Sequence, residues 1–186
     1  MQHIGQRSSW QAVTTGLLGG AIGVLALDLF QQQLSPLLMG DNNEAGGNGH
    51  ATIGALDDIA VIGQHHRPQE SSTAALGRIV YHLLENQEPD KETKEELSYA
   101  VHYGYGILQG GVYGLSRAER DDVDLTGGLL FGAGLWLFGD ELAVPLLGLQ
   151  DGPTASPPAT HLNRLAAHFV YGATTAVATQ LLRRIS

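Results

Sequence analysis

The sequence predicts an all-α, polytopic membrane protein: four transmembrane helices as two tandem hairpins, plus one amphipathic interfacial helix. Two observations predict this fold. Uncharged apolar stretches are long enough to cross a bilayer, and basic residues stand at ends that four crossings place on one side. A similarity between the two halves of the chain predicts the pairing into hairpins. With 186 residues, we expect a single membrane domain over 1–186.

The four predicted crossings differ in how clearly they stand out. A helix needs about 20 apolar residues to cross roughly 30 Å of hydrocarbon. No charged residue occurs in 12–27 or in 125–139, so the first and third crossings are the clearest. The other two are shorter and each contains a histidine, which also fits a buried helix of a soluble bundle. The predicted spans are 10–30, 98–115, 125–149 and 165–182.

The positions of the basic residues predict the topology, because Lys and Arg concentrate in cytoplasmic segments near helix ends. The loop 150–160 contains neither Lys nor Arg, whereas the opposite ends of the four spans carry arginines. Both termini are therefore expected in the cytoplasm. The arginines concerned are Arg7, Arg117, Arg120, Arg183 and Arg184.

The segment 31–90 is then an extracytoplasmic insert. Its stretch 41–49, DNNEAGGNG, predicts a flexible loop. An amphipathic helix near 73–86, with Ser72 or Thr73 as its N-cap, is expected at the membrane surface or over the bundle. Asp90 is expected to cap the next helix. The apolar stripe of the amphipathic helix comprises Leu76, Ile79, Val80, Leu83 and Leu84.

Two other interpretations of the apolar stretches stay open. The first stretch also has the basic start and small-residue site of a cleaved secretory signal. The whole chain also fits a soluble four-helix bundle. An internal similarity argues against the signal, since GLLGGAIGVLALD (16–28) aligns without a gap to GLLFGAGLWLFGD (128–140), and HYGYG (102–106) matches HFVYG (168–172). Duplication of a helical hairpin explains both matches and predicts a pseudo-two-fold axis along the membrane normal.

Glycines recur at four-residue spacing, as in Gly16 with Gly20 and Gly128 with Gly132. This GxxxG spacing lets helix backbones approach closely in lipid, where no hydrophobic effect drives association. The chain contains no cysteine, which excludes disulfides, thiolate metal sites and cysteine nucleophiles. A net charge of −9 makes nucleic acid an unsuitable partner.

The ionisable residues within the apolar stretches are the candidate functional residues, because charge at membrane depth is costly. At 1.5 Å per residue, His102, Asp140 and His168 each lie roughly 22 Å from the inner surface, and Asp28 roughly 27 Å. With Glu141 they form a predicted polar cluster near the outer leaflet. His161, Tyr105 and Tyr171 are secondary candidates.

Several kinds of chemistry fit this cluster. The side chains could hydrogen-bond across helices and fix the packing, or pass protons or cations. They could also ligate a divalent metal, or His102 and His168 could hold a haem or other tetrapyrrole. The cofactor and any metal are left open by the spacing. His65 and His66 are expected in a solvated loop, and hydrolase or nucleotide-binding motifs are absent from the sequence.

Three segments together resemble the YagU-like family of bacterial inner-membrane proteins, a domain of unknown function. They are AVHYGYGILQGGVYGL (100–115), GDELAVPLLGL (139–149) and HLNRLAAHFVYG (161–172), and the similarity extends over roughly 72–184. The resemblance implies a small multi-pass protein of the bacterial cytoplasmic membrane with a loose link to acid tolerance. The positions shared with the family pattern are His102, Tyr103, Asp140, Glu141, Pro145, His161, His168, Tyr171 and Gly172.

We therefore expect a non-enzymatic integral membrane protein with the lipid bilayer as its first partner. It would act as an accessory subunit of a membrane complex, with other membrane subunits as partners, or as a stress factor in acid tolerance. Proton or cation transport through the polar cluster is the first alternative, and tetrapyrrole binding is the second.

Overall fold

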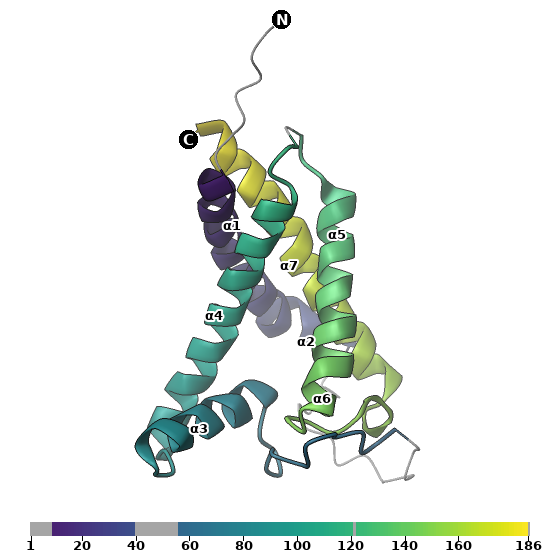
Figure 1. The fold of residues 1–186 in the computed structure, drawn as a ribbon. Helices are drawn as coiled ribbons and strands as arrows, with labels where there is room; N and C mark the ends of the chain where they lie inside the picture. The colour runs from purple at the N-terminus through teal and green to yellow at the C-terminus, as the bar shows by residue number, and fades with distance from the viewer. Residues whose placement is uncertain (1–8, 40–55, 121, 186) are drawn as a thin grey trace, which may run out of the picture. The chain divides into compact units, whose positions relative to one another are not determined.

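The computed structural model describes residues 9–39, 56–120 and 122–185; the loop predicted at 41–49 lies outside them. Every regular element in these ranges is a helix, so the all-α class is confirmed (Figure 1). Three elements depart from α geometry: η1 and η2 are π-helical and η3 is a 3₁₀ turn. The elements are α1 (Ser9–Leu29), η1 (Phe30–Leu34), α2 (Ser35–Met39), α3 (Ser72–Glu85), α4 (Lys91–Ser116), α5 (Leu125–Gly134), η2 (Leu135–Ala143), α6 (Val144–Leu146), η3 (Pro153–Ala155) and α7 (Pro158–Ile185).

Two continuous helical stretches of the described chain, Ser9–Leu37 and Leu125–Leu146, are long and apolar enough to cross a membrane. The first contains the first predicted span, and the second covers residues 125–146 of the third predicted span, while α4 and α7 are more polar. The first helix does not end near residue 30 as predicted, because η1 and α2 continue it to Met39. Part of the predicted insert is thus a helical extension of the first span.

The chain divides into two compact units, which we call unit 1 and unit 2. Among the described residues, unit 1 contains 9–35, 105–133 and 165–185, and unit 2 contains 36–39, 56–104 and 134–164. Helices α4 and α7 each contribute one portion to unit 1 and the other to unit 2.

In unit 1, α1 packs on α4 through glycines on both helices. A Cβ atom added at Gly20 would lie 2.7 Å from both the carbonyl oxygen of Gly106 and the Cα of Gly110. One turn earlier, Gly16 meets the carbonyl of Gly110 and the Cα of Gly114 in the same way. The predicted GxxxG contacts therefore form, and they bring two backbones together where no side chain fits.

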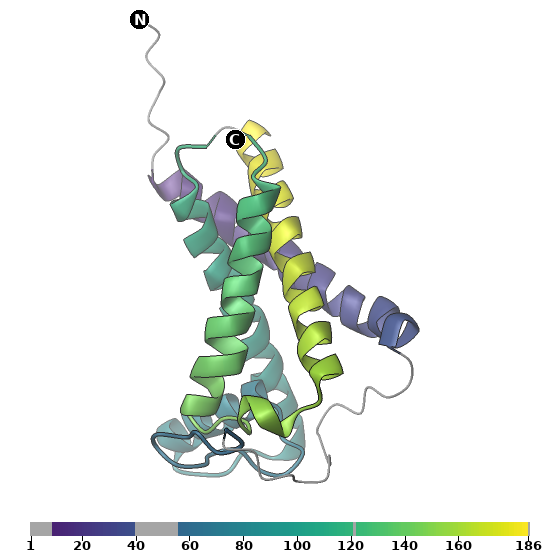
Figure 2. The same cartoon turned by 90° about the vertical axis from the view of Figure 1, so that its right-hand side faces the viewer.

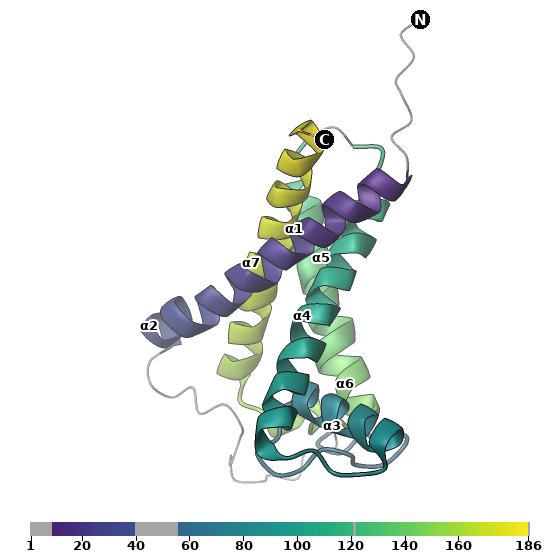
Figure 3. The ribbon, with the colours of Figure 1, turned by 90° about the vertical axis from the view of Figure 1, so that its left-hand side faces the viewer.

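Helix α7 receives α1 and α5 on its own small residues. Gly19 and Gly23 of α1 face the side chains of Thr179 and Thr175, and Figure 3 shows α1 crossing α7 and α4. On α5, Gly128 meets the carbonyl oxygen of Gly172, and Gly132 meets that of His168. Helices α5 and α7 accordingly run side by side (Figure 2).

Most leucines of α1 and of the unit 1 portion of α4 are exposed, although Val24, Leu27 and Phe30 are buried. The buried residues of α1 include four glycines, whereas Leu18, Leu25 and Leu29 are more than half exposed. On α4, Leu108 and Val112 are likewise exposed while Gly106, Gly110 and Gly114 are buried. In water, leucine and valine are among the residues most often buried and glycine gives little area to bury, so this distribution is the reverse of a soluble helical core.

In unit 2, η2 and α6 form one continuous helical segment that ends just before Gly148. Pro145 explains the π-helical turns that precede that proline. Proline has no backbone N–H, and its ring clashes with the carbonyl four residues earlier. The helix adopts i to i+5 bonding instead, and the N–H of Val144 donates to the carbonyl of Gly139. Gly148 then takes a left-handed conformation (φ +65°) and ends the helix.

Helix α3 packs in unit 2 against the N-terminal portion of α4, as Figure 1 shows. Gly77 lies against Leu97, and the hydroxyl groups of Thr73 and Ser98 are 2.8 Å apart. The N-cap is Ser71, whose hydroxyl accepts from the N–H of Ala74, and not Ser72 or Thr73 as predicted. The shift arises because the residue that caps is the one held in extended geometry, with ψ of 153°.

The apolar stripe of α3 does not face α4. The buried positions are Ala74, Ala75, Gly77 and Arg78, while Leu83 and Leu84 are more than three quarters exposed. The next helix begins as predicted, since Asp90 Oδ1 accepts from the N–H of Thr93 at 2.8 Å. The expected helix near 73–86 is thus α3, and it presents its leucines outward.

Candidate functional site

The predicted polar cluster draws on both units. Asp28, His168, Tyr105 and Tyr171 belong to unit 1, and His102, Asp140, Glu141 and His161 belong to unit 2. Asp28, His102, Asp140 and His168 are half-buried. Among the described residues, no group of three or more His, Asp or Glu side chains is arranged to hold a metal ion.

Within unit 2, Glu141 and His161 form a direct pair. The Nδ1 atom of His161 lies 2.7 Å from Glu141 Oε1, and its Nε2 lies 3.2 Å from the carbonyl oxygen of Ser156. Their side chains are 9% and 19% exposed. Both ring nitrogens thus face acceptors, so the protonated imidazolium satisfies both contacts, whereas a neutral ring donates to only one.

A π-helical segment and the first turn of an α-helix position this pair. Glu141 lies in η2, whose π turns precede Pro145, and His161 lies in the first turn of α7. The neighbouring Asp140 contributes its main chain, because its carbonyl accepts from Gln150 Nε2 at 2.7 Å. π-helical turns occur frequently at functional sites in proteins. The residue pattern of η2 does not by itself predict such turns.

In unit 1, Tyr171 is buried and its hydroxyl donates to the carbonyl of Gly106 at 2.6 Å. This bond links the two similar sequence segments, HYGYG and HFVYG, through one residue of each. Tyr105, the counterpart of Tyr171 in that alignment, is exposed. Tyr171 therefore fixes α7 to α4.

Two arginines near the ends of α4 and α7, Arg117 and Arg183, form contacts that the sequence did not predict. Arg183 is buried and donates to the carbonyl oxygens of Arg117 (2.6 Å) and Gly114, near the C-terminus of α4. The helix dipole favours a cation at that end. Arg117 forms an ion pair with Asp124 at 3.4 Å. Arg183 thus closes the end of the unit 1 bundle.

The core of unit 2 contains an ion cluster, which we call the Glu70 cluster, that sequence reasoning missed. Glu70 Oε1 lies 2.9 Å from Arg78 Nε and 3.2 Å from Lys94 Nζ, and its Oε2 accepts from the N–H of Arg67. The Glu70 side chain is 1% exposed. The partners lie 8 and 24 positions away, a spacing that marks no shared helix face, so no sequence pattern identified them.

Burial by itself raises the pKa of the Glu70 carboxyl, but hydrogen bonds from Arg78, Lys94 and the Arg67 N–H outweigh it and lower the pKa to about 2. The same contact with Glu70 raises the pKa of Arg78. The cluster is therefore fully charged at neutral pH, and it joins α3 and α4 to the loop that contains Arg67.

Loop-to-loop hydrogen bonds complete unit 2. The carbonyl of Gly148 accepts from the backbone N–H groups of His65 (2.8 Å) and His66 (3.0 Å), and the N–H of Gly152 donates to the carbonyl of Asp57. His66 is not simply solvated as predicted, because its Nδ1 lies 3.2 Å from the Gly148 carbonyl and its side chain is 16% exposed. His65 is exposed as expected.

Comparison with protein-family models, with curated proteins and with solved structures gives no match to this chain. The resemblance to the YagU-like family stays an expectation from the three motifs. The function proposed below therefore rests on the contacts and burial within each of the two units.

Proposed function

We propose that this chain is a non-enzymatic, multi-pass integral membrane protein that acts as an accessory subunit of a membrane complex. The observation that carries the proposal is the distribution of side chains in unit 1, where the glycines of the helix contacts are buried and most leucines of α1 and α4 are exposed. A solvent of lipid tails removes the cost of exposing leucine and makes close backbone packing the main source of association.

The four-crossing topology belongs to this proposal. Helices α1 and α5 lie within the two stretches long and apolar enough to cross. Glycine contacts hold α4 along α1 over at least two turns and α7 along α5 over at least one. A helix packed along a crossing helix shares its depth, so α4 and α7 cross as well.

Duplication of a hairpin is also part of the proposal, and contacts between α1 and α7 support it. Extended without a gap beyond the matched segments, the two alignments pair Gly19 and Thr179 with Phe131 and Tyr113, whose rings are 5.2 Å apart. Likewise Thr15 and Arg183, 3.4 Å apart, correspond to Gly127 and Arg117. A Cβ at Gly127 would lie 2.5 Å from Arg117 Nη2. Corresponding positions thus meet in both interfaces, as a pseudo-two-fold axis requires.

The unit 2 loops and the Glu70 cluster would then lie outside the membrane, with the α3 leucines at its surface. Docking to other subunits is assigned to unit 2, whose polar loops are joined to one another by the hydrogen bonds at Gly148 and Gly152. In this proposal Glu141, His161 and the other members of the predicted cluster have structural roles.

Cysteine accessibility tests the topology, and the natural absence of cysteine makes single-cysteine variants clean. The substitutions are Ser9→Cys, Glu119→Cys and Ala159→Cys, all at exposed positions. A membrane-impermeant maleimide is applied to intact cells and to opened cells. Four crossings place Ser9 and Glu119 on one side and Ala159 on the other.

If only α1 and α5 crossed, Ser9 and Glu119 would be labelled from opposite sides. That result contradicts the four-crossing proposal. A chain that is monodisperse in buffer without detergent contradicts the membrane assignment altogether.

Proton handling is a second candidate, favoured by the 2.7 Å pair of Glu141 and His161. Its test is proton flux into proteoliposomes under an imposed pH gradient. Flux that Glu141→Gln abolishes supports it, and flux no faster than in empty liposomes removes it.

A further inference from the structure

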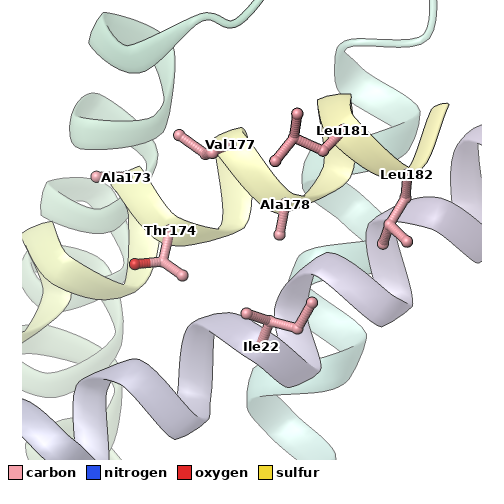
Figure 4. Close-up of a pocket in the computed structure, with 7 residues that line it drawn as sticks. All are labelled: Ile22, Ala173, Thr174, Val177, Ala178, Leu181 and Leu182. Carbon is pink, nitrogen blue, oxygen red and sulfur yellow. The ribbon is translucent and has the colours of Figure 1, made fainter. Parts of the chain in front are cut away.

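An apolar groove runs along the outer surface of unit 1 between α1 and α7 (Figure 4). It is lined by Ile22 of α1 and by side chains of α7 between residues 173 and 182. Its volume is about 490 Å³, within the roughly 300–1,000 Å³ range of small-molecule sites. The lining is almost entirely aliphatic, so its occupant must be hydrocarbon.

Small residues create this groove. Gly19 and Gly23 draw α1 against Thr179 and Thr175, which fixes a close crossing of the two helices. Beside the crossing, Ala173 and Ala178 of α7 are too short to fill the angle between the helices, and Figure 4 shows open space between them and Ile22. Larger residues at the alanines would close it.

The groove has the length of one bilayer leaflet. The stretch of α7 that lines it, from Ala173 to Leu182, rises about 14 Å at 1.5 Å per residue. Half of a hydrocarbon core of roughly 30 Å is about 15 Å. A single acyl chain of the surrounding bilayer therefore spans it from the headgroup level to the midplane.

Just beyond one end of the groove, the same face of α7 carries a cation. Residues Ala173, Val177, Leu181 and Arg184 follow one another at the four-, four- and three-residue steps of a single α-helix face. Arg184 is exposed, whereas the adjacent Arg183 is buried in unit 1. Trp10 of α1, 74% exposed, lies near the same end, since Thr15 contacts Arg183. Exposed tryptophan and arginine are typical of the membrane interface.

We propose that this groove binds one anionic phospholipid, with an acyl chain along residues 173–182 and the headgroup phosphate at Arg184. The inference rests on the membrane assignment made above. The apolar lining accommodates the acyl chain. The Arg184 guanidinium favours a phosphate whose negative charge is not offset by a cationic group in the same headgroup.

The full chain, purified in a mild nonionic detergent, is mixed with dioleoylphosphatidylglycerol or with dioleoylphosphatidylcholine, and native mass spectrometry counts the retained lipid. One phosphatidylglycerol per chain is expected. Arg184→Gln lowers its retention about fivefold, the loss expected for one arginine at the membrane surface, and leaves phosphatidylcholine unchanged. Ala173→Phe, which fills the groove, lowers the retention of both lipids.

Matched controls are Lys91→Gln, at an exposed lysine of unit 2, and Leu108→Phe, at an exposed leucine of α4. Both retain lipid as the unchanged chain does. Val177→Phe replaces Ala173→Phe if the latter lowers the melting temperature. Equal retention in the groove variants overturns the proposal, as does an equal loss in the controls.

A dimer that forms without lipid and that Ala173→Phe dissociates identifies a second copy as the occupant, which also overturns the lipid proposal. A chain that needs detergent but retains no lipid overturns this inference alone. A chain that is monodisperse without detergent overturns the membrane assignment with it.

Discussion

Different kinds of contact hold the helices together in unit 1 and in unit 2. Unit 1 brings backbones into contact at glycines such as Gly16 and Gly110, and most leucines of its α1 and α4 portions are exposed. Unit 2 is held by a buried ion cluster around Glu70 and by loop hydrogen bonds to Gly148. Under the membrane assignment proposed above, one chain is adapted to two solvents, because glycine contacts are effective where lipid removes the hydrophobic drive and charged clusters form where water is near.

The largest effect is expected when a side chain is forced into the glycine contact of unit 1. In Gly110→Leu, the new Cβ meets the carbonyl of Gly16 and the Cα of Gly20, which are backbone atoms that cannot move aside. We expect a loss of about 4 kcal/mol or more in the free energy of unfolding. Thermal unfolding in detergent, followed by circular dichroism, measures it.

Gly104→Ala is the matched control on the same helix, because no atom lies within 4 Å of a Cβ added there. Replacing a helical glycine by alanine at an open site stabilises a helix by about 0.5–1 kcal/mol. If the two substitutions had equal effects, the contrast between the units would be unfounded.

A smaller effect is expected when the Glu70 cluster is broken. Glu70→Gln leaves the Arg78 guanidinium buried beside a neutral amide, and removal of one partner of a buried ion pair costs about 3 kcal/mol. Chemical unfolding of the variant measures the loss. The double variant Glu70→Gln with Arg78→Met should recover part of it; strictly additive losses would show that the two side chains do not interact.

Acid should weaken the same cluster without any mutation. Because folding lowers the pKa of Glu70 from 4.5 to about 2, its contribution is complete above about pH 5 and is lost as the pH falls toward 2. At pH 3 the expected loss is about 2 kcal/mol. In Glu70→Gln, the free energy of unfolding should not show this loss between pH 5 and pH 3. A variant with the same pH dependence as the unchanged chain would contradict the assignment.

The smallest effect is expected at the pair of Glu141 and His161. A double-mutant cycle of Glu141→Gln and His161→Phe should give a coupling free energy of about 1.5 kcal/mol, the lower end of the range for a hydrogen bond that involves a charged group. The readout is again thermal unfolding in detergent. A coupling near zero would remove this pair from the contacts that hold unit 2.

The sequence predicted the helices of unit 1 better than the contacts of unit 2. Uncharged runs and four-residue glycine spacing are local patterns, so the first span and the close contacts at Gly16 and Gly20 could be inferred directly. The polar cluster could not be assembled in this way. Depth along each helix places His102 and His168 at one level, but rotation about the helix axis decides which side chains meet.

By itself, the chain's pattern of charge and glycine determined an all-α protein with two membrane-length apolar stretches, because helix formation and lipid compatibility depend on neighbours a few residues apart. Only the tertiary structure decided which partners complete the buried charges. Glu70 with Lys94 and Arg183 with the end of α4 join distant segments. Such pairs form where backbone paths bring a charge and its partner within about 3 Å, a distance that no local sequence pattern encodes.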